Sequence, residues 1–188
     1  VDARNGEIMF GLNMVVHKGK TIFVGDTSVH EYPTSEQMAE IAISTARVVR
    51  LFGFDPKVAF VSHSTFGQPL TSRTKHIRKA VDILKEKKVD FEFDGDMQPD
   101  VALNSEYEEL YPFSKIVGNA NILIMPGQHS AAISYKMMKT LGDTKVIGPL
   151  LVGLGLPIEI APLRSSTSEI INLASIAAYS SDVIDYKK

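Results

Sequence analysis

Short apolar runs mark the candidate strands of this chain. Lys57–Ser62 and Asn121–Met125 contain no alternation of apolar and polar residues. A run of this kind indicates a strand that is buried on both faces, as in a parallel sheet. Val89–Phe93 is a further predicted strand. Near the start, Ile8–Val16 and Thr21–Val24 flank a short polar stretch with a glycine, which predicts a hairpin.

Helical spacing of apolar residues separates these strands. Thr34 and Gln37 fit a capping box before a helix that ends near Phe52, because each side chain can satisfy a free backbone donor. Ser130 is the predicted cap of a helix over Ala131–Leu141, and a serine of the run 165–168 is expected to cap a last helix. The other predicted helices cover Arg73–Lys87, Gln98–Leu103 and Glu169–Tyr179.

The alternation of strands and helices from Lys57 to Leu141 predicts right-handed βαβ units. The predicted fold class is therefore α/β, a three-layer α/β/α domain with a mainly parallel sheet and a hairpin at its start. Ile147–Pro157 places three glycines and two prolines among aliphatic residues, so its backbone is expected to pack closely against another segment. We expect a strand over Ile158–Leu163.

Composition narrows the possible functions. The 188 residues are 44% hydrophobic, which is enough for a full core, and the net charge of −2 without a long single-sign run argues against nucleic-acid binding. Cysteine is absent, so no disulfide or thiolate metal site exists. No signal peptide and no membrane-spanning run is found, and a cytoplasmic protein is expected. The chain begins Val1-Asp2 without an initiator methionine, so we expect it to be part of a longer protein.

Candidate chemistry lies in three polar loops after predicted strands. In open parallel sheets, ligands bind beyond the carboxyl ends of the strands. The loops are His63-Ser64-Thr65, Asp94-Gly95-Asp96 and Pro126–Ser130, and their polar groups are expected to meet at one rim. His63 and His129 are either general acid–base groups or ordinary polar loop residues. Capping is favoured over metal binding for Asp94 and Asp96, so no metal is expected in this chain.

Family resemblance comes from the stretch Asn119–Pro157. It reads A-N-x-L-x-x-P, then I-S-Y-K, L-G and I-G-P-L-L-x-G-L-x-x-P. This pattern resembles the phosphate acetyl/butyryltransferase family, and most closely the phosphotransacetylase-like region at the C-terminal end of bacterial NADP-dependent malic enzymes. The resemblance extends from about Phe10 to Tyr179. It implies the isocitrate/isopropylmalate dehydrogenase-like fold of phosphotransacetylases.

Departures from the family pattern bear on activity. Phe66 stands where phosphotransacetylases usually carry a basic residue, whereas the segment D-G-D-M-Q-P-D is nearly intact. In the family, a serine and an aspartate help to activate the thiol of coenzyme A, and an arginine binds the acyl phosphate. Alignment through Ile170-Ile171-Asn172 places Pro162 at the serine, Leu163 at the arginine and Glu169 at the aspartate. Proline has no hydroxyl, and leucine cannot stabilise the charge of a transferring group.

The resemblance then implies a regulatory module that has lost its catalytic residues. It would bind acetyl-CoA as an effector and support oligomerisation in an NADP-dependent, oxaloacetate-decarboxylating malic enzyme. No cofactor is expected in this chain, while NADP and a divalent metal (Mg or Mn) would serve the parent's own catalytic region. The expected partners are acyl-CoA, that catalytic region, and further copies in a homodimer or higher homo-oligomer. The predicted ligand-binding residues are Ser62, Ser64, Thr65, Gln128, Ser130, Tyr135 and Lys136.

Two alternatives remain open. One is an active phosphate acetyl/butyryltransferase, in which Arg164 and Glu169 replace the usual catalytic pair. The other is an oligomerisation module without a ligand. Family members form their site between two lobes. Residues 1–150 would be the second lobe, and residues 151–188 would be the terminal segment that returns to an absent first lobe.

Overall fold

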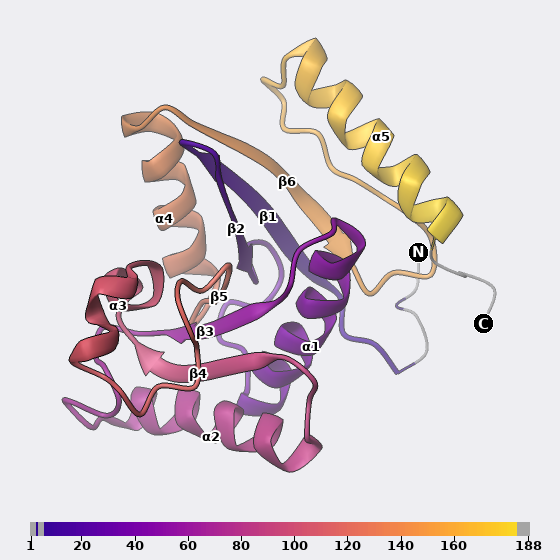
Figure 1. Ribbon diagram of the computed structural model, residues 1–188. Coiled ribbons are helices and arrows are strands. Elements are labelled where there is room, and N and C mark those ends of the chain that lie inside the picture. The colour runs from indigo at the N-terminus through magenta and orange to yellow at the C-terminus, as the bar shows by residue number, and fades with distance from the viewer. Residues whose placement is uncertain (1–2, 4–5, 184–188) are drawn as a thin grey trace.

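A six-stranded sheet lies between two layers of helices (Figure 1). The computed structural model describes residue 3 and residues 6–183. The strands are β1 (Phe10–His17), β2 (Lys20–Gly25), β3 (Lys57–Val61), β4 (Glu92–Met97), β5 (Ile122–Ile124) and β6 (Thr144–Val152). The helices are α1 (Ser35–Leu51), α2 (Ser72–Lys87), α3 (Pro99–Leu103), the 3-10 helix η1 (Ser105–Glu109), α4 (Gln128–Leu141) and α5 (Thr167–Val183).

The strand order is β4-β3-β5-β2-β1-β6. The pairs β4–β3, β3–β5 and β5–β2 are parallel. β1 pairs antiparallel with both β2 and β6, so within this sheet it alone runs against the others. The predicted α/β class with a mainly parallel sheet and an initial hairpin is confirmed.

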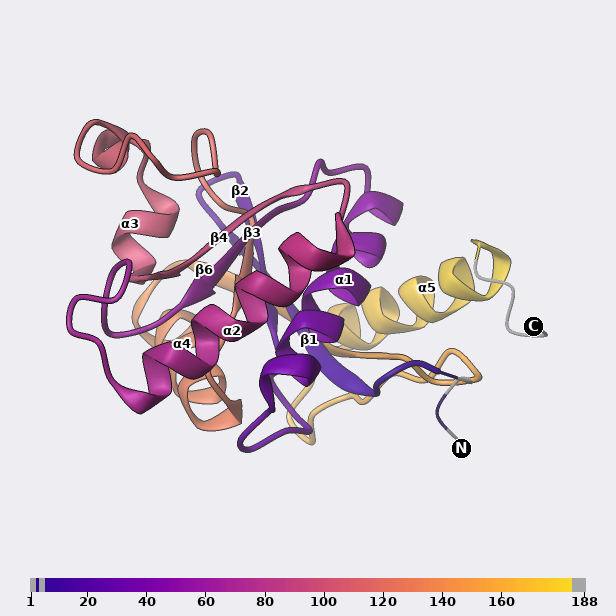
Figure 2. The same ribbon diagram turned by 90° about the horizontal axis from the view of Figure 1, so that it is seen from below.

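Crossover direction decides which face each helix covers. From β2 through β3 to β4 the chain moves towards one edge of the sheet, and from β4 through β5 to β6 it moves back towards the other. Because parallel crossovers are right-handed, this reversal places the outgoing helices on one face and the returning helices on the opposite face. Accordingly, α1 and α2 lie over one face of the sheet and α3 and α4 over the other (Figures 1 and 2). The first two helices share one buried cluster with the sheet, and the other two contribute to a second cluster.

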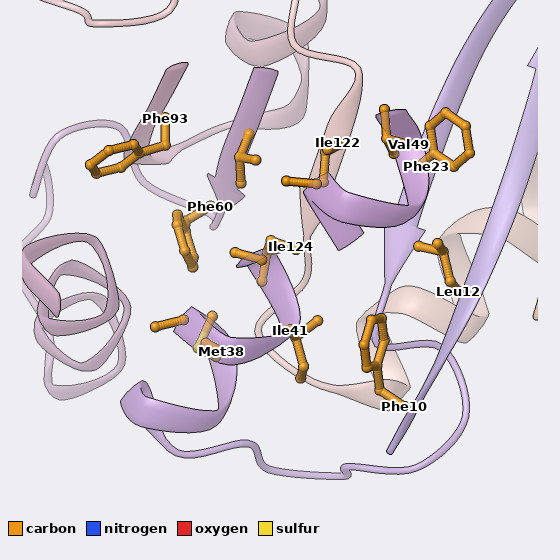
Figure 3. Close-up of a cluster of buried hydrophobic side chains, with 14 of the residues drawn as sticks. Phe10, Leu12, Phe23, Met38, Ile41, Val49, Phe60, Phe93, Ile122 and Ile124 are labelled. Atoms are coloured by element: carbon orange, nitrogen blue, oxygen red, sulfur yellow. The ribbon is translucent and has the colours of Figure 1, made fainter. Parts of the chain in front are cut away.

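The larger core lies between the sheet and the layer of α1 and α2 (Figure 3). Phe60, Ile122 and Ile124 of the central strands meet Met38 and Ile41 of α1 there, and all five side chains are essentially fully buried. Each such side chain contributes about 1.5–3 kcal/mol on burial. Alternate residues of the same strands point into the second cluster, so the two-sided burial predicted for Lys57–Ser62 and Asn121–Met125 is confirmed.

Local capping agrees with the sequence in two places and differs in one. Thr34 and Gln37 form the complete capping box of α1, as predicted. Ser166 and Glu169 bond reciprocally at the start of α5, because the Ser166 N–H donates to the Glu169 carboxylate (2.8 Å) while the Glu169 N–H donates to the Ser166 hydroxyl (3.3 Å). The prediction for Ser130 is wrong. Gly127 occupies the cap of α4, and the Ser130 hydroxyl donates to the Gly127 carbonyl (2.8 Å).

Two strand predictions also need correction. Asp94-Gly95-Asp96 was expected to be a loop, but it lies within β4, and both aspartates are buried. Ile158–Leu163 forms no strand, since only Glu159 makes an isolated bridge there, to Leu150. The sequence analysis did not identify β6, whose glycine and proline are unusual for a strand.

The glycine-rich segment packs as closely as its composition predicted. A Cβ atom on Gly148 would lie 2.8 Å from the Leu12 carbonyl oxygen, and one on Gly153 would fall on the carbonyl oxygen of Ile8. β6 crosses residue 150, the expected lobe boundary, because Leu151 still pairs with Gly11 of β1. Beyond it, α5 lies alongside β6 at the edge of the sheet (Figure 1).

Replacing Gly153 by alanine should destabilise the fold more than replacing Gly19. Both glycines have φ near +80°, at +84° and +77°, so both variants incur backbone strain of order 1–3 kcal/mol. Only the Gly153→Ala side chain meets a backbone atom, whereas a Cβ on Gly19 meets nothing within 4 Å. Urea unfolding should show a loss for Gly153→Ala that exceeds the Gly19→Ala loss by about 2 kcal/mol or more. Equal losses would contradict the close packing of β6 against the segment before β1.

Candidate ligand-binding site

The sheet has a topological switch point beside β5. The chain leaves β2 and β3 towards α1 and α2 on one face, and it leaves β5, between them, towards α4 on the other face. Loops that diverge in this way leave a crevice outside the carboxyl ends of the strands. A crevice of about 590 Å³ lies there, and we call it the switch-point crevice. Its lining residues are Glu31, Tyr32, Val61, Ser62, His63, Arg73, Ile77, Pro99, Met125, Pro126, Gly127, His129, Ser130 and Ser134.

Basic and hydrogen-bonding side chains dominate the polar part of this crevice. The Arg73 guanidinium lies 5.0 Å from the centre of the Tyr32 ring. His129 Nε2 lies 2.9 Å from a Glu31 carboxylate oxygen, and His63 is exposed in the next loop. The first turn of α4 also opens into the crevice, and the positive end of a helix dipole favours anions. The arrangement suits a ligand with negatively charged groups.

Buried hydrogen bonds fix the loop between β2 and α1 that carries Glu31 and Tyr32. The Asp26 carboxylate is 2% exposed and accepts bonds from the backbone N–H groups of Gly11 (2.9 Å), Ser28 (2.8 Å) and His30 (2.7 Å). A buried carboxylate is tolerated when several donors surround it, and here those donors belong to β1 and to the loop itself. The wall of the crevice is therefore held to the sheet.

Close backbone approach joins the same loop to the start of α4. A side chain on Gly127 would collide with the Glu31 carbonyl oxygen. The Gln128 N–H donates to the His30 carbonyl (3.1 Å), and its side-chain amide donates to the Ser28 carbonyl (3.2 Å). Gln128 was predicted to contact ligand, and in this structure its amide holds two loops together.

Ser64 and Thr65 lie behind the crevice. Ser64 is fully buried, and its hydroxyl donates to Oδ2 of Asp96, while Oδ1 of this fully buried carboxylate has no hydrogen-bond partner among the described residues. Thr65 accepts a bond from the Gln98 N–H (3.2 Å). These bonds tie the loop after β3 to β4. Of the predicted ligand-binding residues, only Ser62 and Ser130 meet in the crevice.

Tyr135 and Lys136 line a different hollow, which we call the α4–α5 groove. It has a volume of about 190 Å³ and lies between α4, β6 and the start of α5. Lys139, Pro162 and Glu169 line it too, so the segment aligned with the family's catalytic residues meets the predicted ligand-binding residues of α4. The other lining residues are Asn13, Val146, Ile147, Gly148, Pro149, Ser165, Asn172 and Leu173.

Glu169 is already engaged inside this groove. Its carboxylate accepts bonds from the N–H and the hydroxyl of Ser166 (2.8 and 3.0 Å) and pairs with Lys139 (3.0 Å). The Ser166 backbone bond, followed by Lys139, lowers the pKa of Glu169 from 4.5 to about 2. A carboxylate with so low a pKa is a weak proton acceptor near neutral pH.

Three other residues at departures from the family pattern lie away from both hollows. Phe66 packs on Phe113 and Tyr111, with ring centres 4.8 and 5.5 Å apart. Leu163 is fully exposed, and Arg164 is exposed as well. Leu163 and Arg164 are not among the residues that line the α4–α5 groove.

Tyr32, Arg73 and Lys139 line these hollows but were not predicted from the sequence. Lys139 could have been found, because it lies three residues after Lys136 and therefore on the same side of a helix. Arg73 and Tyr32 carried no such signal, since they reach the crevice only through the packing of α2 against the loop after β2.

The described residues hold no group of three or more His, Asp or Glu side chains placed to bind a metal ion. No helix in this part of the chain is both long enough and apolar enough to cross a membrane.

Comparison with known proteins agrees with this geometry. The family model described as phosphate acetyl/butaryl transferase matches residues 1–178, and the chain belongs to this family. An NADP-dependent malic enzyme of Rhizobium meliloti is 46% identical over 179 residues, which cover 95% of this chain and 24% of that enzyme. A phosphate acetyltransferase of Clostridium acetobutylicum is 36% identical over 82% of this chain and 47% of its own length.

A solved phosphotransacetylase from Streptococcus pyogenes superposes with a TM-score of 0.89 at 30% identity, covering 96% of this chain and 56% of that structure. The chain thus spans about a quarter of the malic enzymes that it matches and about half of the phosphate acetyltransferases of Clostridium acetobutylicum and Bacillus subtilis. It is a phosphotransacetylase-like domain of a kind that malic enzymes share.

Removing the Ser64 hydroxyl should destabilise the protein. In Ser64→Ala, the buried Asp96 carboxylate loses the hydroxyl that bonds it, and the expected cost is about 2 kcal/mol. Ser175 is the matched control, because its hydroxyl bonds one turn back along exposed α5. Chemical unfolding should show little change for Ser175→Ala, and equal stabilities of both variants would contradict the role assigned to Ser64.

Proposed function

We propose that this chain is a regulatory acyl-CoA-binding domain that has lost phosphotransacetylase chemistry and acts within an NADP-dependent malic enzyme. The observation that carries the proposal is the composition of the α4–α5 groove. Tyr135 and Lys136 of the family pattern I-S-Y-K line it as hydrogen-bonding and cationic groups, but Pro162 occupies the position at which the family resemblance expects a serine. The groove therefore keeps side chains that could bind a ligand, while Pro162 cannot supply the serine hydroxyl that the family's reaction uses.

The state of Glu169 supports the same proposal. If it replaced the family's aspartate as a proton acceptor, its pKa should lie nearer to the working pH. Instead, Ser166 and Lys139 hold its pKa at about 2, and the carboxylate caps α5. Phe66 likewise packs within an aromatic cluster rather than offering a cation.

An active phosphate acyltransferase remains the second candidate, since relatives with that name match most of this chain. Such activity would need Arg164 to bind the acyl phosphate. Arg164 is exposed and lines neither hollow in this structure, so it would have to move towards Glu169 to act. The regulatory proposal needs no such movement.

An acyl-CoA molecule is long enough to contact two chemically different hollows, the switch-point crevice and the α4–α5 groove. Arg73 and the helix start of the switch-point crevice suit phosphate groups, and Lys136 of the α4–α5 groove suits a further anionic or carbonyl group. α4 contributes residues to both hollows. Acetyl-CoA is the proposed effector, and it would change the parent's activity by binding two parent states with different affinity.

The proposed parent supplies what this chain lacks. Its separate catalytic region would use NADP and Mg or Mn, in the cytoplasm. Residues 1–150 are proposed as a second lobe and residues 151–188 as a segment that packs on a first lobe. Ile170 and Ile171 of α5 are half exposed or more in this structure and would be covered by such a lobe or by a second copy in a homo-oligomer.

Acetyl-CoA should bind the intact parent enzyme, as measured by isothermal titration calorimetry. Lys136→Ala should weaken this binding about tenfold or more, because a charge-assisted hydrogen bond contributes about 1.5–3 kcal/mol. Lys79→Ala is the matched control, since Lys79 is an exposed lysine that pairs with Glu36 on α1.

Three outcomes of this titration differ in meaning. Binding to the parent and to this chain alone would place the effector site wholly on these residues. Binding to the parent alone would mean that the site also needs the first lobe. If neither binds, the regulatory proposal is wrong, and an oligomerisation role is left.

A further inference from the structure

Two aromatic side chains lie next to each other in the switch-point crevice. Tyr32 comes from the loop between β2 and α1, and His129 comes from the first turn of α4. The centres of their rings are 6.5 Å apart, and the ring planes differ by 30°. Tyr32 is 64% exposed, so its ring is open to a ligand rather than used as core packing. We call Tyr32 and His129 the aromatic pair.

Contacts on both segments hold the aromatic pair in place. His129 Nε2 lies 2.9 Å from a carboxylate oxygen of Glu31, the residue before Tyr32. The Arg73 guanidinium lies over the Tyr32 ring, 5.0 Å from its centre. A cation in this position is attracted to the face of the ring. Because the rings are already placed, a planar ligand that packs on them loses little binding energy to ordering.

The rest of the crevice adds apolar surface and a cation. Val61, Ile77 and Met125 line it and are almost fully buried. Stacking of a nucleobase on an aromatic side chain typically raises affinity by about fivefold to a hundredfold. Arg73 offers several N–H donors in the planar arrangement that phosphate oxygens accept. A molecule that carries both a base and phosphates, which is a nucleotide, matches these surfaces.

We propose that the aromatic pair binds the adenine base of an acyl-CoA molecule, while Arg73 and the first turn of α4 contact its phosphates. This inference rests on the acyl-CoA function proposed above, and it adds the direction in which the ligand lies. Ser134 lines the switch-point crevice, and the next residue, Tyr135, lines the α4–α5 groove. The acyl end of the ligand therefore follows α4 into that groove and lies beside Pro162.

The opposite direction fits the two hollows less well. It would place the base in the α4–α5 groove, whose volume is about 190 Å³, against about 590 Å³ for the crevice. The aromatic side chain that lines the groove is Tyr135, and Lys136 Nζ lies 6.0 Å from the centre of its ring. A narrow thioester chain suits the smaller hollow, and Lys136 can donate to its carbonyl oxygen. The base and ribose suit the larger hollow with its two rings.

ADP is the probe for the aromatic pair, because acyl-CoA contains an ADP unit and ADP lacks the acyl chain. Isothermal titration calorimetry on the 188-residue chain compares ADP with pyrophosphate, which carries the phosphates without a base. ADP should bind at least about fivefold more tightly than pyrophosphate. Use of this chain avoids the NADP site proposed for the parent's catalytic region, which would also accept ADP.

Tyr32→Ala should remove the preference for ADP. It should weaken ADP binding about fivefold or more and leave pyrophosphate binding unchanged. Tyr32→Phe keeps the ring and should bind ADP as the unaltered chain does. Tyr179→Ala is the matched control, since Tyr179 is an exposed tyrosine on α5 that lines neither the crevice nor the groove.

Acetyl-CoA titrated into the intact parent enzyme separates this inference from the proposed function. Tyr32→Ala in the parent should weaken acetyl-CoA binding about fivefold or more. If the unaltered parent does not bind acetyl-CoA, the acyl-CoA function itself is wrong, and this inference is wrong with it. If the unaltered parent and Tyr32→Ala bind acetyl-CoA equally well, the acyl-CoA function stands and the inference about the aromatic pair alone is wrong.

Two results with ADP would also overturn the inference. One is an ADP affinity that is no better than the pyrophosphate affinity, or that Tyr32→Ala leaves unchanged. The other is a larger loss of ADP affinity in Lys136→Ala than in Tyr32→Ala, which would place the base in the α4–α5 groove. If Tyr32→Ala unfolds, which circular dichroism would reveal, the comparison of ADP with pyrophosphate on the unaltered chain still decides.

Discussion

Burial of the short strand β5 on both faces is the constraint on which the rest of the fold depends. Ile122 and Ile124 lie in the core beneath α1 and α2, whereas Leu123 and Met125 lie in the cluster on the other face. A strand buried in this way needs helices on both sides. The right-handed crossovers supply them because the chain reverses direction after β4. The same reversal creates the switch-point crevice, since the loops after β3 and β5 must diverge.

The hollows around this sheet hold candidate binding groups, and we propose that they lack a complete reacting set. In the α4–α5 groove, two lysines and a tyrosine lie beside Pro162, and Glu169 serves as a helix cap with a low pKa. In the loop after β3, Ser64 and Thr65 serve to attach the loop to β4. Glu169, Ser64 and Thr65 thus make structural contacts in this structure, and this supports the regulatory proposal.

The apolar pattern predicted the fold well where burial alone decides structure. β3, β5 and the initial hairpin were found in this way, and the polar pair Thr34 and Gln37 gave the capping box of α1. β6 was missed because Gly148 and Pro149 are poor strand residues, and its pairing with β1 overrides that local preference. The segment Asp94-Gly95-Asp96 read as a loop because buried aspartates are rare, and only the donors from Ser64, Gly95 and Lys115 make them tolerable in a strand.

The candidate site could be predicted only in part. The rule for open parallel sheets placed the loops with His63 and Ser130 at one rim, and both residues line the switch-point crevice. It could not show that α4 carries Tyr135 and Lys136 away to a second groove, or that α5 lies along β6. Those features depend on contacts between distant segments.

Acyl transfer by the intact parent enzyme tests the central claim most directly. Acetyl phosphate and coenzyme A are mixed with the enzyme at saturating concentrations, and formation of acetyl-CoA is followed over time. The account predicts a rate no greater than that without enzyme, because Pro162 and Leu163 provide neither the hydroxyl nor the cation that the transfer needs. A clear enzyme-dependent rate that is lost in Arg164→Ala would contradict the account and establish an active acyltransferase.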